Sequence, residues 1–137
     1  PGETEDDFRA LLDFVETLCP DHTAAFIYCP EEGTRAAGLP QTVPQPVARE
    51  RHQELLEVAR CCAQARSEEL VGKTLRVLVE GTDEETGGDY VGRTFRDAPG
   101  VDGHFYLESM GGPLQPGSFT EALVKSCEAN DLRGRMV

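Results

Sequence analysis

Residues 74–109 read TLRVLVEGTDEETGGDYVGRTFRDAPGVDGHFYLES, and this stretch decides the fold. Leu75, Val77 and Val79 alternate with polar residues, which is the period of two that is typical of a half-buried β-strand. Four further strand candidates follow, separated by glycine- and proline-rich turns: 89–95, 104–109, 119–127 and 132–137. Five short strands within about seventy residues predict a small, closed, antiparallel barrel of the type that binds oligonucleotides and oligosaccharides.

The residues before this barrel predict helical and buried extended elements. Thr4 and Asp7 form a capping-box-like start, and apolar residues then recur at helical spacing until Pro20. Thr23–Cys29 is short, apolar and aromatic, which predicts a buried strand. A proline-rich loop leads to residues 47–69, where helical spacing returns. We therefore expect an α+β chain with three parts, namely a short α/β segment (1–46), a linker helix (47–69) and the barrel (70–137).

The composition excludes some classes of function. The apolar runs are far shorter than the roughly 18 residues that cross a bilayer, so we expect no membrane segment. Thirteen basic residues against 25 acidic ones give a net charge of −12, which repels phosphate and attracts basic partners. The five cysteines show no C-x-x-C spacing, which argues against a disulfide framework or a zinc site and indicates a reducing, cytoplasmic compartment.

Acidic residues are the main candidates for binding a partner, because no catalytic or metal-ligating constellation stands out. They form two groups, one at a hairpin tip and one in a tight loop: Asp83, Glu84 and Glu85, and Asp97 and Asp102. Solvated surface is the plainer interpretation of the first group. Asx-turn chemistry explains the second group as well as partner binding does, so both interpretations stay open.

Several segments, in this order, resemble the C-terminal part of the radical-SAM methylthiotransferases. They are PGET (1–4), FIYCP (26–30) with EGTRAA (32–37), the helix 49–69, and VGKT (71–74) with LVEG (78–81), GRT (92–94) and LRG (132–134). The resemblance implies that residues 1–46 are the end of a radical-SAM barrel and that residues 70–137 are an appended TRAM barrel. The chain opens in the middle of the first motif, so we expect a fragment of a longer protein.

The loop 96–103, RDAPGVDG, resembles the ADAPxIDG stretch of one branch of that family. This branch methylthiolates an aspartate of a small-subunit ribosomal protein. The barrel carries 11 acidic and 7 basic residues, a net charge of −4, which suits docking onto a basic protein. From charge and loop position we predict that the two acidic groups form a docking surface for a basic small-subunit ribosomal protein. We expect the chain to be a monomer.

The resemblance also implies cofactors, namely S-adenosylmethionine and two 4Fe–4S clusters in the complete enzyme. The family's cluster cysteines have no counterparts here, so we expect no catalytic residue, metal ligand or bound cofactor, and an inactive chain. Gly2 and Glu3 match the end of a pattern beside the bound nucleoside, and Phe26 and Tyr28 resemble residues near its adenine. Alternatively, the two aromatic residues simply pack in the core of the radical-SAM barrel.

Two other classes of function stay open. One is a methylthiotransferase that modifies tRNA, whose barrel would need a basic face assembled by folding. Its candidates are Lys73, Arg76, Arg93, Arg96, Arg133 and Arg135. The other is a free-standing binding module, for which the missing cluster motifs are the main support.

Overall fold

The computed structural model describes residues 1–40, 42–82, 90–109 and 112–137. The chain forms two compact units, Pro1–Cys62 and Ala63–Val137, and helix α2 (Gln45–Glu68) contributes residues to both. Within the described residues, no helix combines the length and the apolar character that a bilayer crossing requires.

The first unit begins with helix α1 (Glu5–Leu18), as the sequence predicts. The Thr4 hydroxyl accepts a hydrogen bond from the Asp7 amide at 3.1 Å, and the Asp7 carboxylate accepts one from the Thr4 amide at 2.8 Å. This capping box satisfies two amides at the helix start that have no partner within the helix. Cys19 ends the helix in the left-handed conformation, and its amide bonds to the Val15 carbonyl.

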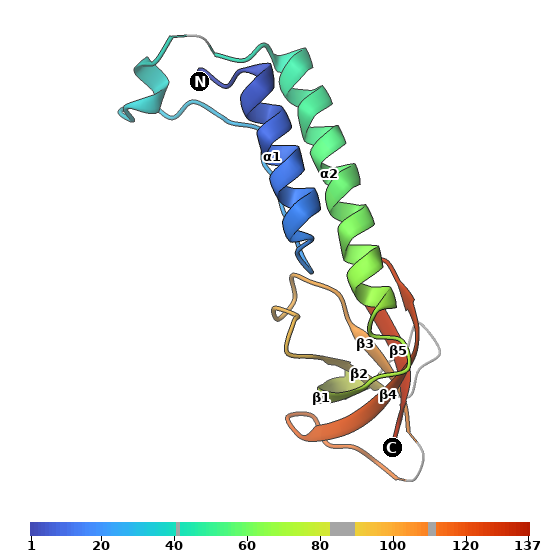
Figure 1. Ribbon diagram of the computed structural model, residues 1–137. Helices are drawn as coiled ribbons and strands as arrows, with labels where there is room; N and C mark the ends of the chain where they lie inside the picture. The colour runs from blue at the N-terminus through green and yellow to red at the C-terminus, as the bar shows by residue number, and fades with distance from the viewer. Residues whose placement is uncertain (41, 83–89, 110–111) are drawn as a thin grey trace. The chain divides into compact units, whose positions relative to one another are not determined.

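Helices α1 and α2 run side by side in the same direction within the first unit (Figure 1). Phe8 and Val15 of α1 pack with Leu55 of α2, and all three side chains are buried. The connecting segment returns toward the start of α1 and contains a short 3₁₀ helix, η1 (Ala36–Gly38). The helix predicted over residues 47–69 is thus present as α2.

The prediction of a buried strand over Thr23–Cys29 is wrong. These residues adopt no regular secondary structure, and Phe26 is 91% exposed. A strand is stabilised by hydrogen bonds to a neighbouring strand, and the described residues offer none beside this segment. The apolar and aromatic composition indicated a buried strand, but the described residues do not provide a neighbouring strand that would bury it.

The second unit is a closed barrel of five strands in the order β1-β2-β3-β5-β4, as the sequence predicts. The strands are β1 (Thr74–Thr82), β2 (Tyr90–Arg93), β3 (Phe105–Glu108), β4 (Phe119–Glu128) and β5 (Asp131–Met136). Strand β1 pairs with β2 on one side and with β4 on the other, which closes the ring, so that each strand in the described part of the chain has a neighbour on both sides. Bulges in β1 and β4 interrupt the register and bend these two long strands.

One of the five pairings, β3 with β5, is parallel, whereas the sequence predicted an antiparallel barrel. The reason is geometric, because directions cannot alternate all the way around a ring with an odd number of strands. At least one neighbouring pair must then run the same way. The other four pairings are antiparallel.

Gly134 of β5 lets the barrel core close. A Cβ atom there would collide with the Leu123 carbonyl oxygen and would lie 2.7 Å from Cζ of Phe105. Phe105 is fully buried, so its ring fills the space that the missing side chain leaves. The buried core around it consists of Val77, Val79, Phe105, Leu107, Ala122, Val124 and Leu132.

Replacing Gly134 is therefore expected to damage the barrel. Gly134→Ala should lower the free energy of unfolding by about 2 kcal/mol, the usual cost of overpacking a core. Urea denaturation of the 137-residue chain measures this loss. Gly81→Ala is the matched control, because a Cβ at Gly81 meets nothing within 4 Å. Equal effects of the two variants would contradict the packing argument.

Candidate functional site

A cavity of about 290 Å³ in the first unit brings together three of the four residues predicted to bind a cofactor. Glu3, Phe26 and Tyr28 all line it, although Phe26 and Glu3 are 23 positions apart in the sequence. The fourth residue, Gly2, directly precedes Glu3 and has a left-handed backbone with φ of 83°. Phe8, Ile27 and Leu55 add apolar surface to the cavity wall.

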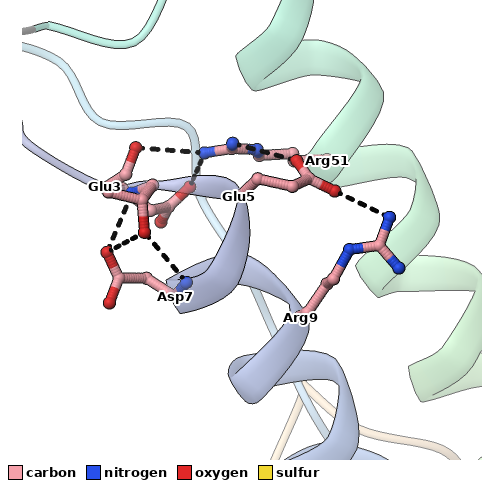
Figure 2. Close-up of polar contacts among 6 residues, drawn as sticks. Glu3, Glu5, Asp7, Arg9 and Arg51 are labelled. Carbon is pink, nitrogen blue, oxygen red and sulfur yellow. Dashed lines mark hydrogen bonds and ion pairs between the residues drawn. The ribbon is translucent and has the colours of Figure 1, made fainter.

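Arg51 of α2 holds the N-terminal segment at this cavity (Figure 2). Its Nη1 donates to Glu3 Oε1 at 2.6 Å, and its Nη2 donates to Glu5 Oε2 at 3.2 Å. The guanidinium also lies over the Phe8 ring, 5.3 Å from the ring centroid. The hydrogen bond to Glu3 raises the pKa of Arg51, a side chain that is already charged at physiological pH.

His52, the next residue of α2, holds the other wall. Its Nε2 lies 3.0 Å from the Ala25 carbonyl oxygen and donates to it, which fixes the segment that carries Phe26 and Tyr28. Two consecutive residues of one helix thus anchor both segments of the cavity. Sequence reasoning selected neither Arg51 nor His52 as a site residue, because the partners of both are distant in sequence.

The capping box of α1 adds negative charge next to the Arg51 network. Hydrogen bonds from the Thr4 hydroxyl and the Thr4 amide to the carboxylate lower the pKa of Asp7. A carboxylate with a lowered pKa contributes stability above its unfolded-state pKa of about 3.9 and loses it as the pH falls through the folded-state pKa. Figure 2 shows these contacts beside those of Glu3, Glu5 and Arg9. The capping box therefore favours the folded state at neutral pH, where the Asp7 carboxylate is charged.

The cavity walls match the chemistry of a nucleoside better than that of a metal. Aromatic and aliphatic side chains form most of the lining, and the polar residues are Glu3, Thr42, Gln45, Arg51 and His52. The volume lies near the lower end of ligand pockets, about 300–1,000 Å³. In the described part of the chain, no group of three or more His, Cys, Asp or Glu residues is placed to hold a metal ion.

The cysteines do not suit an iron–sulfur cluster, which requires several converging thiolates. Burial raises the pKa of Cys62 and of Cys127, which keeps both as thiols. Cys29 and Cys61 are exposed, and Cys19 is half-buried beside Cys62. The residues of this chain therefore do not fit the clusters that the resemblance implies for the complete enzyme.

In the second unit, Asp97 lies in the loop between β2 and β3 and is only 7% exposed. Its Oδ2 accepts hydrogen bonds from the Thr94 amide at 2.9 Å and from the Thr94 hydroxyl at 2.7 Å. Its Oδ1 lies 3.6 Å from Nε of Arg96, whose side chain is 1% exposed. The carboxylate predicted to face a partner thus faces the interior, where it holds the loop and balances a buried cation.

The other predicted docking residues have different positions. Asp102 is half-buried, and its Oδ2 accepts a hydrogen bond from the Ala98 amide at 2.8 Å. It therefore closes a turn within the same loop, by a bond to an amide four residues earlier rather than by the bond to a later amide that defines an Asx turn. Asp83, Glu84 and Glu85 lie outside the described residues.

Four of the six basic residues that are candidates for a tRNA-binding face are engaged in contacts within the second unit. Arg96 is buried, and Nε of Arg93 donates to Glu80 at 2.8 Å. Arg76 stacks on Phe119 at 4.2 Å, and Arg133 stacks on Tyr106 at 4.6 Å, each distance measured to the ring centroid. These two arginines come from different strands, β1 and β5, which are not neighbours in the barrel.

The barrel and its loops define a class of domain. Residues 71–137 match the model of the TRAM domain family. The predicted appended barrel is therefore confirmed. The match agrees with the barrel fold of the second unit, but it does not cover the first unit. The first unit is identified by comparison with whole proteins.

Similar proteins extend the match over both units. The chain is 44% identical over 98% of its length to the ribosomal protein uS12 methylthiotransferase RimO of Thermus thermophilus. It is 40% identical over its whole length to the RimO protein of Pelotomaculum thermopropionicum, and 36% identical to that of Proteus mirabilis. The predicted resemblance to methylthiotransferases is thus confirmed. The chain spans about 30% of the length of these relatives.

The buried role of Asp97 generates a stability prediction. Asp97→Ala should lower the free energy of unfolding by about 3 kcal/mol, because it leaves Arg96 as a buried charge without its carboxylate and removes two hydrogen bonds. Asp102→Ala, which removes the hydrogen bond to the Ala98 amide at a less buried site, should cost about 1 kcal/mol. Urea denaturation of both variants measures the difference. Losses of equal size would contradict a structural role for Asp97.

Proposed function

We propose that this chain is the C-terminal, substrate-docking portion of a cytoplasmic radical-SAM methylthiotransferase that modifies an aspartate of ribosomal protein uS12. The observation that carries the proposal is the similarity to named uS12 methylthiotransferases across both units rather than across the barrel alone. A free-standing binding module would need no resemblance in the first unit. The barrel is the part that we assign to docking.

Electrostatics favour a basic protein over RNA as the docking partner. The chain carries a net charge of −12, and the barrel alone carries −4. Of its basic residues, Arg96 is buried and Arg93 is paired with Glu80, which leaves fewer cations to neutralise phosphates. A basic ribosomal protein experiences attraction from the same field.

We assign the cavity of the first unit to the adenosine part of S-adenosylmethionine in the complete protein. When bound, that cofactor supplies the carbon radical of the reaction. Phe26 and Tyr28 offer ring faces for the adenine, and Glu3, fixed by Arg51, provides a carboxylate in the same wall. Gly2 allows the backbone turn that places Glu3 there.

Direct binding tests the docking proposal. The 137-residue chain, labelled with a fluorophore, is titrated with purified uS12 of Thermus thermophilus and, separately, with total tRNA, and anisotropy reports binding. We expect uS12 to bind at least about tenfold more tightly than tRNA, with an affinity that falls as salt is added, because opposite charges are screened. Tighter binding of tRNA than of uS12 would contradict the proposal and favour the tRNA-modifying alternative.

A further inference from the structure

The loop between β2 and β3, residues 94–104, exposes two large apolar side chains. Phe95 and Val101 are each 81% exposed, although Phe105 and Leu107 just beyond the loop are fully buried. Ala98 and Pro99 of the same loop are exposed as well. Exposed aromatic and aliphatic residues that cluster in one short segment are typical of contact sites for other proteins.

This loop is fixed in place rather than held only at its ends. The buried Asp97 carboxylate ties the start of the loop to Thr94, and Asp102 closes a turn onto the Ala98 amide. At the far end, a Cβ on Gly103 would collide with the Asn130 backbone, so the loop packs directly on the β4–β5 turn. A partner that binds a fixed loop loses little conformational entropy in ordering it.

Of the two arginines at this loop, one is covered and the other is paired with an acidic residue. Arg96 has a side chain that is 1% exposed, and Arg93 at the edge of the loop donates to Glu80. A partner that approaches this loop therefore contacts apolar side chains on the surface of a protein with a net charge of −12. This combination is complementary to a segment in which lysines or arginines flank apolar residues, and it offers few exposed cations to a phosphate backbone.

We propose that Phe95 and Val101 anchor the docking of a basic protein segment, and that Asp97 and Asp102 are positioning residues that hold these anchors rather than contact residues. This inference rests on the proposed function and names the surface that performs it. Binding energy at protein interfaces concentrates in a few apolar anchors, whereas partly exposed charges contribute mainly to the association rate.

The test compares two double variants, each of which replaces one phenylalanine and one valine by serine at different positions of the chain. Phe95→Ser with Val101→Ser removes the proposed anchors. Phe119→Ser with Val137→Ser is the matched control, because these residues are 57% and 66% exposed and lie on β4 and at the C-terminus. Both are titrated into uS12 of Thermus thermophilus beside the unaltered chain, after circular dichroism has shown that each is folded.

We expect the loop variant to raise the Kd for uS12 at least about tenfold and the control to change it less than about twofold. If the unaltered chain binds and the loop variant binds equally well, the anchor assignment is overturned while the docking function stands. Equal weakening by both variants also overturns it, because the contact would then be nonspecific. Failure of the unaltered chain to bind uS12 contradicts the proposed function and the anchors together.

Discussion

Closure of a five-stranded ring is the constraint on which the second unit depends. An odd ring requires one parallel pair, and here the chain places it between β3 and β5, which the long strand β4 separates in the sequence. The closed ring pairs every strand on both sides, and its small interior has room for Phe105 only because Gly134 lacks a side chain. The core is then filled, so recognition falls to the outer surface and the loops.

The loop between β2 and β3 illustrates how a charged sequence can build an apolar surface. Its carboxylates bond to amides and a hydroxyl of the loop itself, and its arginine Arg96 is enclosed, so the loop presents Phe95 and Val101 instead. The first unit is built in a similar way. Arg51 and His52 use their polar groups for hydrogen bonds that hold two segments of a cavity wall. In both units, polar contacts position the residues that we assign to binding.

Local patterns predicted the elements that depend on local physics. The capping box of Thr4 and Asp7, the helical spacing of α1 and the alternation in β1 are all confirmed. The strand predicted over Thr23–Cys29 failed because a strand depends on neighbours that no local pattern reveals. The burial of Asp97 was also unpredictable, since the direction in which a loop side chain points follows from tertiary contacts. Glu3, Phe26 and Tyr28 were found through family resemblance, and the cavity that joins them emerged only from the fold.

The β2–β3 loop, rather than a strand face, is the surface that we assign to recognition of a basic protein. An NMR titration of the isotope-labelled 137-residue chain with unlabelled uS12 of Thermus thermophilus tests this assignment most directly, residue by residue. The account predicts that the largest shift changes fall on residues 94–103 and that the amides around Tyr106 and Arg133 on β3 and β5 change little. Shift changes that concentrate on β3 and β5 and leave the loop unaffected would contradict it.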